Sequence, residues 1–255
     1  MRPVGGGPPI KWDSTVWDAW NATKSRIERR ILLNGTDWFV WDADKAFKSI
    51  WQFHGAYWNV TTQAIIGACE GGPLYSSRTG AGTIVHLNEA GGGIQLQTGV
   101  MLNDYVSIYT MATPAGAAQP YNITKNPYFH VRARLPNASD LLNHVVFMGF
   151  YNAVNQLMGF IFDITVDANW HFVTTDATGT QNTALGAVDT SLHDFYFWTE
   201  DAGTTVKFCM DAAASQSHNT KISVVNQSLW IDNQDAVLNA VRYLDIKEMR
   251  VIQDW

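Results

Sequence analysis

The clearest pattern along the chain is the order of apolar and polar residues between positions 128 and 174. In Phe129–Leu135, apolar residues occupy the odd-numbered positions and His or Arg the even-numbered ones. Successive side chains of a strand leave opposite faces of the sheet, so this period of two predicts a half-buried strand. Val145–Tyr151, Met158–Val166 and the shorter Trp170–Val173 are more continuously apolar, which is typical of strands covered on both faces. Turn-forming residues separate these runs, so the segment predicts an antiparallel meander.

Shorter runs with similar patterns lie on both sides of this segment. We expect strands at residues 37–42, 83–87, 93–98, 105–111, 195–199, 205–211, 222–225 and 242–254, and a short turn or helix at 234–240. Residues 176–189 are interpreted as a loop or hairpin, and residues 212–220 as a loop. Turn signals recur about every 8–12 residues and we count roughly twelve to fourteen strands, which predicts an all-β sandwich of two antiparallel sheets.

The first 36 residues have a different pattern. Residues 1–13 are rich in Gly and Pro and predict an extended arm. We expect a short helix after it, with Ser14 as its N-cap and Asn34-Gly35 as its end. Its apolar residues recur near one helical face: Val16, Trp20, Ile27 and Ile31. We therefore divide the chain into an N-terminal arm and helix at 1–36, for attachment or oligomerisation, and a β-sandwich at 37–255.

Tryptophan is concentrated near the N-terminus. Seven of the eleven tryptophans precede residue 60. They have three interpretations: they fasten the N-terminal segment to the sandwich, they form a subunit interface, or they stack on sugars. Trp and Tyr are enriched at interfaces, and the arm has the character of an appendage rather than a groove. For an interface the candidates are Trp12, Trp17, Trp20, Trp38 and Trp41.

Composition excludes several classes of protein. Charged residues make up 16% of the chain, the formal net charge is −6, and no basic cluster exceeds Arg26–Arg30, so we expect no nucleic-acid partner. No run approaches the roughly 20 apolar residues of a membrane helix, so we expect no membrane partner. The N-terminus has no apolar core of a secretory signal. Cys69 and Cys209 are interpreted as buried thiols, with a disulfide between them left open.

Seven segments follow one another in an order that is informative. They are Gly91–Gly99, Asn103–Thr110, Asn126–Leu135, Phe147–Asn152, Phe162–Thr175, His193–Ala212 and Tyr243–Gln253. This order resembles the concanavalin A-like lectin/glucanase jelly roll over about residues 37 to 255. The resemblance implies two curved antiparallel sheets packed face to face, with ligand often on the concave sheet. It implies no single function, because the fold carries lectins, glycosidases, lyases and structural modules.

The sequence lacks the carboxylates that a glycosidase of this fold would display. Retaining glycosidases use two carboxyl groups about 5 Å apart. The Glu-x-Asp-x-Glu pattern of the resembling enzymes is absent, and the best pair, Asp163 and Asp167, would lie ~13 Å apart on a strand. No Gly-x-Ser-x-Gly motif supplies a serine nucleophile. We expect no enzyme, although carboxylates from distant strands leave a glycoside hydrolase or lyase open.

The joint from Asp163 to His171 faintly resembles the metal loop of legume lectins. The Glu that this loop carries two residues before its first Asp is missing, and Phe160-Ile161-Phe162 precedes Asp163. We interpret the joint as an ordinary turn between strands and expect no metal or other cofactor.

Exposed Trp and His side chains are the candidates for binding a sugar. Trp stacks on sugar rings, and His forms hydrogen bonds with hydroxyl groups. Ligand-binding candidates are Trp170, His171, His193 and Trp198. Core packing is the alternative for both tryptophans, since they interrupt apolar strands.

These features combine into one leading hypothesis about function. A chain with an extracellular character but no secretory signal is typical of virion proteins, and such jelly rolls resemble decoration, fibre and tail modules of bacteriophages. We expect a non-catalytic structural protein on the virion surface, a homo-oligomer that contacts neighbouring capsid or tail proteins through its N-terminal arm and binds host glycans. The alternatives are a free extracellular carbohydrate-binding lectin and a glycan-degrading enzyme of the same fold.

Overall fold

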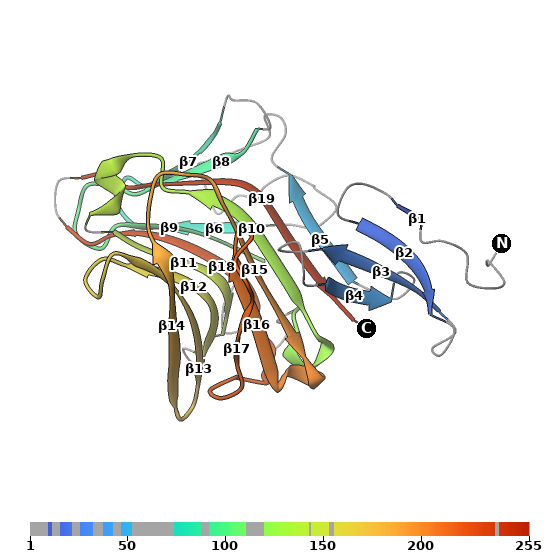
Figure 1. The fold of residues 1–255 in the computed structure, drawn as a ribbon. Coiled ribbons are helices and arrows are strands. Elements are labelled where there is room, and N and C mark those ends of the chain that lie inside the picture. Colours follow the sequence, from blue (N-terminus) through green and yellow to red (C-terminus); the bar gives the residue numbers. More distant parts are fainter. Residues whose placement is uncertain are drawn as a thin grey trace.

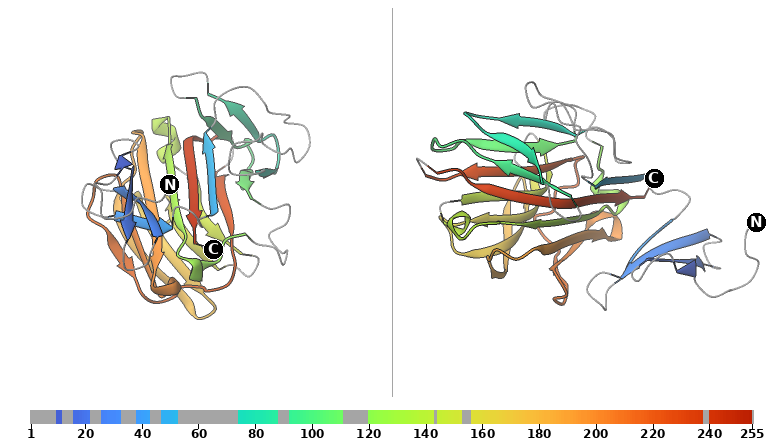
Figure 2. Two further views of the ribbon diagram at one scale, coloured as in Figure 1. Left: turned by 90° about the vertical axis from the view of Figure 1, so that its right-hand side faces the viewer. Right: turned by 90° about the horizontal axis from the view of Figure 1, so that it is seen from above.

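Two antiparallel sheets packed face to face form the main body of the structure, a computed structural model (Figure 1). Figure 2 shows these sheets as curved layers from two further directions. Backbone and side chains are described for residues 74–87, 92–110, 120–142, 144–152, 156–237 and 240–254. Before residue 53, the backbone of five strands is described.

The first sheet has eight strands. They are β5 (Phe47–Gln52), β7 (Thr83–His86), β8 (Ile94–Gln97), β10 (Tyr128–Arg134), β15 (His193–Glu200), β16 (Thr205–Met210), β17 (Gln216–His218) and β19 (Tyr243–Gln253). Their order is β17-β16-β15-β10-β19-β8-β7, and β5 also pairs with β19. β10 pairs along one edge of β19, while β8 and β5 pair with successive halves of the other edge. The long β19 therefore joins strands from distant parts of the chain.

The second sheet has seven strands. They are β6 (Tyr75–Arg78), β9 (Tyr105–Tyr109), β11 (His144–Tyr151), β12 (Leu157–Asp163), β13 (Asn169–Asp176), β14 (Gly179–Ala187) and β18 (Ser228–Asp235). Their order is β14-β13-β12-β11-β18-β9-β6. The connections carry three short 3-10 helices: η1 (Ile123–Lys125), η2 (Ala138–Leu141) and η3 (Asp201–Gly203).

The segment 128–174 is divided between the two sheets, so the expectation of a single meander is wrong. β10 pairs with β15 and β19 in the eight-stranded sheet, whereas β11, β12 and β13 are neighbours in the seven-stranded sheet. The odd-numbered residues of β10 face the core, as the alternation predicted. Alternation identifies a strand and its buried face, but it does not identify the sheet that the strand joins.

The expected N-terminal helix is also wrong, because the chain there forms a four-stranded sheet. Its strands are β1 (Ile10–Lys11), β2 (Val16–Asn21), β3 (Arg26–Leu32) and β4 (Trp38–Asp42), in that order. β2 and β3 pair with Val16 opposite Ile31 and Asp18 opposite Arg29. Apolar residues four positions apart lie on one face of a strand as well as on one face of a helix. Pairing of apolar with apolar residues and of acidic with basic residues across neighbouring strands favours the sheet.

Five strands of the two sandwich sheets were missing from the expected strands. β14 lies in the segment interpreted as a loop or hairpin, β17 in a segment interpreted as a loop, and β5, β6 and β18 lie where no strand was expected. The strand expected at 222–225 is not formed. β14 is an edge strand whose residues alternate between half-buried and exposed, and it has few apolar residues to reveal it. β18 alternates Leu229 and Ile231 with outward residues, but its inward positions continue with the polar Asn233 and Asp235. Polar residues on the buried face hide such a strand from a pattern search.

The core between the sheets is built largely from phenylalanine. Phe172 on β13 stacks on Phe208 on β16 with ring centroids 4.1 Å apart, and Phe160 on β12 lies 5.1 Å from Phe195 on β15. These four residues are fully buried. Aromatic pairs of this kind add to the free energy gained from burial. The Cys209 side chain is buried, as expected, whereas Cys69 lies outside the described residues.

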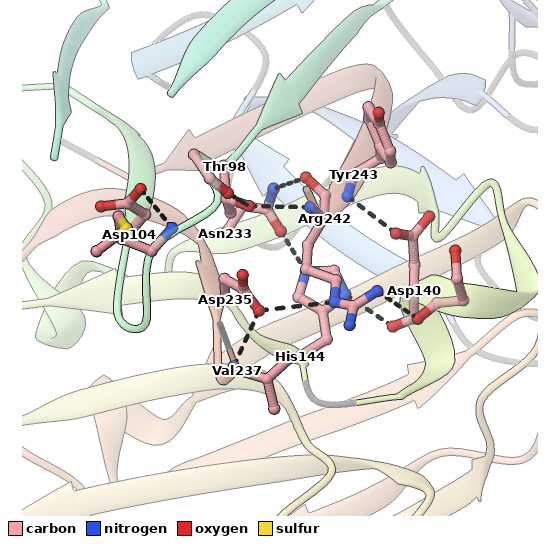
Figure 3. A network of polar contacts seen from close by, with 12 residues as sticks. Thr98, Asp104, Asp140, His144, Asn233, Asp235, Val237, Arg242 and Tyr243 are labelled. Carbon is pink, nitrogen blue, oxygen red and sulfur yellow. Dashed lines mark hydrogen bonds and ion pairs between the residues drawn. The ribbon is translucent and has the colours of Figure 1, made fainter. Parts of the chain in front are cut away.

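At one end of the sandwich a buried polar network joins the two sheets (Figure 3). The Asn233 amide on β18 donates to the carbonyl oxygens of Leu96, 2.8 Å away on β8, and Arg242, 3.1 Å away before β19. The same side chain contacts His144 on β11. Burial lowers the pKa of His144 to about 4, and the ring Nδ1 lies 2.9 Å from the Asp140 carbonyl oxygen. Both layers are held in register by hydrogen bonds that cross between them.

Arg242 extends this network to the connections. Its Nη1 donates to the Ser139 carbonyl oxygen at 2.7 Å, and its Nε lies 3.7 Å from Oδ1 of the buried Asp235. The Asp140 carboxyl accepts from the Tyr243 backbone N–H at 3.2 Å. Every contact fixes the start of β19 against η2 or β18. We assign this cluster a structural role, because its polar groups face one another across the core.

Replacing Asn233 with Ala should destabilise the fold. The substitution leaves the Leu96 and Arg242 carbonyl oxygens without the amide donor, so the free energy of unfolding should fall by about 3 kcal/mol. The matched control is Gln234→Ala, because Gln234 is the next residue of β18 and faces outward; its effect should stay within about 0.5 kcal/mol. Chemical denaturation measures both, and equal small effects would contradict the structural role of the network.

Candidate functional site

The outer face of the seven-stranded sheet carries rows of side chains that the strand register brings side by side. Directly paired residues of antiparallel strands project to the same face. One row crosses five strands from β9 to β13: Ser107, Asp232, Phe147, Ile161 and His171. The next row begins on β6 and ends on β12: Tyr75, Tyr109, Trp230, Gly149 and Gly159. Both rows point away from the phenylalanine core.

A pocket of about 380 Å³ opens on this face. It lies over β9, β18, β11 and β12, which are consecutive neighbours in the sheet (Figure 1). Its lining is mostly aromatic and aliphatic, with a few polar groups: Tyr105, Ser107, Phe147, Tyr151, Leu157, Ile161, Trp230 and Asp232. An apolar hollow with a few polar groups is the usual form of a small-molecule site.

Trp230 is the central aromatic residue of the pocket. One of its faces stacks on Tyr109, with ring centroids 4.7 Å apart and planes 12° apart, and Tyr109 in turn stacks on Tyr75 at 6.2 Å. Tyr151 approaches Trp230 at 5.5 Å with a tilt of 51°. Trp230 is half-buried, so the stack supports the ring without covering it.

Two glycines leave space beside Trp230. Gly149 on β11 is paired with Trp230, and Gly159 on β12 is paired with Gly149. No side chain therefore projects from two consecutive strands at this level of the row. A Cβ atom would come within 2.2 Å of the Met158 carbonyl oxygen from Gly149, and within 2.5 Å of the Met148 carbonyl oxygen from Gly159. Contacts this short with backbone atoms exclude a larger residue at either position.

Asp232 supplies the carboxyl group of the pocket. It follows Trp230 by two residues on β18, and its Oδ1 accepts a hydrogen bond from the Ser107 hydroxyl at 2.5 Å. Burial raises the pKa of this carboxyl to about 6, although the Ser107 hydrogen bond acts in the opposite direction. The group changes charge close to neutral pH, which is a common property of residues in functional sites.

A second carboxyl group on this face, that of Asp163, lies two strands away from Asp232 and caps a turn. Asp163 on β12 faces outward, two residues beyond Ile161 in the Asp232 row. With two strand spacings across and two residues along, its Cα atom lies roughly 12 Å from that of Asp232. Asp163 Oδ1 also accepts from the backbone N–H and hydroxyl of Thr165, at 2.9 and 2.6 Å, which caps the turn. The described face therefore offers one carboxyl at the pocket.

Both tryptophans expected to bind ligand are buried instead. Trp170 is 1% exposed and packs between the sheets, with its ring centroid 4.8 Å from that of Phe195. Trp198 is 2% exposed and donates to a Glu200 carboxylate oxygen at 3.0 Å. Core packing, the alternative given for both, is what the structure shows for Trp170, whereas Trp198 follows the core residue Phe197 on β15 and is buried on the opposite face of that strand.

The two candidate histidines lie on different sheets. His171 is on the outer face of the seven-stranded sheet, next to a register shift between β13 and β14, and contacts Asp167 and Asn182 at 2.8 and 2.9 Å. It shares the Asp232 row, three strands and thus roughly 14 Å away. His193, on β15, lies 2.6 Å from Asp211 and 3.1 Å from Asp189. The hydrogen bond to Asp211 raises the pKa of His193.

The expected residues therefore do not form one site, and the pocket was missed. Trp230 and Asp232 belong to β18, the strand that the sequence pattern did not reveal. Their alternation with Leu229 and Ile231 was the available signal. Ser107 and Tyr105 lie in an expected strand, but their outward face has meaning only when the neighbouring strand is known.

The expected tryptophan interface lies in the N-terminal part of the chain. The side chains of Trp12, Trp17, Trp20, Trp38 and Trp41 lie outside the described residues, so their role at an interface stays a prediction. Within the described side chains, no group of three or more His, Cys, Asp or Glu residues could hold a metal ion. No helix in this part is long and apolar enough to cross a membrane.

Comparison with solved structures identifies the architecture. A β-glucanase of Bacillus licheniformis superposes with a TM-score of 0.51, at 10% identity over 82% of this chain and 99% of that one. The chain has the concanavalin A-like jelly-roll fold. The binding domain of botulinum neurotoxin DC, in complex with rat synaptotagmin II, gives a TM-score of 0.50 at 7% identity, over 73% of this chain and 47% of that chain.

A third jelly-roll match comes from a bacteriophage. It is a conserved carbohydrate esterase from Shiga toxin-encoding bacteriophage phi24B, with a TM-score of 0.49 and 15% identity over 77% of this chain and all of that one. No protein-family model and no curated protein matches the sequence. At such identities the likeness concerns the fold, and this jelly roll occurs in a glucanase and in a toxin binding domain. The fold alone does not decide between binding and catalysis.

Asp232→Asn should stabilise this jelly roll at neutral pH. The pKa of Asp232 is about 6 in the folded protein and about 3.9 in the unfolded chain. The free energy of unfolding of the wild-type protein therefore falls as pH rises from about 4 through 6. Above pH 6 the folded protein carries a poorly solvated charge that the Asn variant lacks. Thermal melts should show the variant's Tm above that of wild type at pH 7.5, with the difference shrinking by pH 4.5.

The control for this comparison is Asp201→Asn, an exposed position on η3 with a positive φ of 52° that Asn tolerates. It removes the same charge outside the pocket, so its Tm difference from wild type should not depend on pH in this way. A pH-independent effect of Asp232→Asn would show that the carboxyl is not poorly solvated.

Proposed function

We propose that this protein is a glycan-binding module whose binding surface is the outer face of the seven-stranded sheet. The carrying observation is the pocket beside Trp230, where an aromatic stack, a glycine gap and the Asp232–Ser107 pair meet. The faces of sugar rings carry C–H groups that pack on the electron-rich face of an aromatic ring. Sugar hydroxyls donate to carboxylates and accept from hydroxyl groups. The pocket offers both kinds of contact within one strand and its neighbour.

The arrangement of carboxyl groups favours binding over hydrolysis. Asp232 lies in the pocket, while Asp163 is separated from it by β11 and is occupied in capping a turn. Hydrolysis by two carboxylates requires a separation of about 5–9.5 Å between the groups. A single carboxyl beside a Trp ring suits recognition of hydroxyl groups. We therefore propose binding without cleavage.

Trp230→Ala should remove most of the affinity for glycans. The variant loses the flat wall of the pocket, and we expect at least about tenfold weaker binding, equivalent to about 1.4 kcal/mol. The matched control is Tyr243→Ala, a half-buried aromatic residue on the outer face of the other sheet, which should bind within about twofold of wild type. A glycan array finds the ligand, and calorimetric titration with the best oligosaccharide compares the three proteins.

The outcome of this experiment separates the two faces of the sandwich. If Tyr243→Ala abolished binding while Trp230→Ala preserved it, the glycan-binding surface would lie on the eight-stranded sheet, which contradicts the proposal. If neither variant changed the affinity, the pocket would not be the binding site. Thermal melts of each variant show that a loss of binding does not arise from unfolding.

We also propose that the module decorates a virion surface, where its N-terminal strands attach it to neighbouring capsid or tail proteins or to further copies of itself. Support comes from the topology: β1–β4 form a sheet of their own, whereas β5 is the first strand to join the sandwich. The attachment segment is then better bounded at residue 42, after β4, than at residue 36. Such a segment would project the pocket toward glycans on a host cell.

Removal of residues 1–42 should separate attachment from binding. Both sandwich sheets keep all their strands, so the truncated chain should unfold cooperatively and bind glycans as the full chain does. Its sedimentation coefficient should be that of a monomer, whereas the full chain should sediment as an oligomer. An unchanged oligomer after truncation would contradict the proposed role of the N-terminal strands.

A further inference from the structure

The charge of the pocket distinguishes among the sugars that it could bind. Among the described residues that line it, Asp232 is the only acidic group and no Lys or Arg occurs. The other titratable groups in the lining are the phenols of Tyr105 on β9 and Tyr151 on β11. The lining on β12, Leu157 and Ile161, is aliphatic. The described pocket therefore holds one negative charge above pH 6 and no opposite charge.

The geometry of Asp232 directs that charge toward a ligand. Its Oδ1 is held by the Ser107 hydroxyl at 2.5 Å, and Ser107 is itself buried. Ser107 is the one described side chain that donates to this carboxyl, a hydrogen bond with the Asn233 backbone also lowers its pKa, and Asp232 is half-buried rather than enclosed. A hydroxyl donor that enters beside Trp230 meets this carboxyl. A carboxylate that enters there meets it without a cation to offset the repulsion.

The shape of the pocket fits a flat ring. Trp230 is fixed by Tyr109 on one side, and the Gly149–Gly159 pair leaves the row open on its other side. Phe147 and Ile161 close the pocket from the adjacent row. Asp232 follows Trp230 at two residues along β18, so the ring face and the carboxylate face the same space. One face of a pyranose ring and its hydroxyl groups can thus be contacted together.

We propose that this pocket selects uncharged sugar rings over uronic and sialic acids, with the ring face on Trp230 and hydroxyl groups donating to Asp232. The proposal rests on the glycan-binding function proposed above and names its ligand class. Selection against anionic sugars arises from an unpaired carboxylate in a poorly solvated pocket, where repulsion is weakly screened. Proteins in general bind carboxylate groups through Arg and Lys side chains. The described lining of this pocket contains neither.

The test compares neutral and acidic oligosaccharides of the same linkage. β-1,4-mannohexaose and the β-1,4-mannuronate hexamer differ at C6, where a hydroxymethyl group replaces a carboxylate; gluco- and galacto-configured hexamers with their uronate counterparts complete the panel. The full-length protein is titrated at pH 7.5 and low ionic strength. We expect at least one neutral hexamer to bind at least ten times more tightly than its acidic counterpart.

Two variants assign this preference to Asp232. Asp232→Asn keeps the size and one acceptor of the side chain but removes its charge, so the preference for the neutral hexamer should fall at least fivefold. Asp201→Asn removes one charge from an exposed position on η3 and should leave the preference unchanged. Titration of wild type at pH 5 should reduce the preference in the same direction, because the pKa of Asp232 is about 6.

Each outcome distinguishes the ligand class from the function. Equal or tighter binding of the acidic hexamers, abolished by Trp230→Ala, would overturn the proposed selection while the glycan-binding function stands. The same holds for a neutral preference that Asp232→Asn leaves unchanged. An absence of binding to every hexamer and to a broad glycan array would overturn the function itself. A neutral preference that falls in Asp232→Asn and persists in Asp201→Asn supports both.

Discussion

The pairing register between β11 and β18 determines which side chains face the core and which face the pocket. It sets Phe147 opposite Asp232 and Gly149 opposite Trp230, while Ile231 faces the core. Because side chains alternate along a strand, a slip of one residue would bury Trp230 and expose Ile231. The Asn233 amide opposes such a slip, because its two acceptors lie on the other sheet. Core packing and the cross-sheet network thus determine the geometry of the pocket.

The pocket also contains features that lower the stability of the fold. Gly149 and Gly159 leave the outer row unfilled, and the strands approach closely enough to exclude any Cβ atom. Asp232 carries a charge in surroundings that favour its neutral form. Elsewhere in the described sandwich, buried polar groups such as Asn233 and Asp140 have several hydrogen bonds. Features that cost stability and lie beside an open pocket are typical of a binding site.

How far the sequence predicts this structure depends on which face of each strand is apolar. β10 and β19 were predicted because their inward residues are apolar, and the jelly-roll fold followed from such strands in order. β18 was not predicted because the polar residues Asn233 and Asp235 occupy inward positions. Trp230 and Asp232, which lie on the same strand, were therefore not recognised as site residues. A pocket spread over four strands also requires their pairing order, which local periodicity does not contain. In the N-terminal segment, spacings of four fit strand and helix equally well.

A ¹H–¹⁵N NMR titration of the isotope-labelled protein with a binding oligosaccharide shows directly whether glycans contact the outer face of the seven-stranded sheet. The largest shifts should occur for the Trp230 indole N–H and the backbone amides of Ser107 and Asp232, all on adjacent strands. Shifts concentrated instead around His193 and Asp211, on the other sheet, would contradict this binding surface.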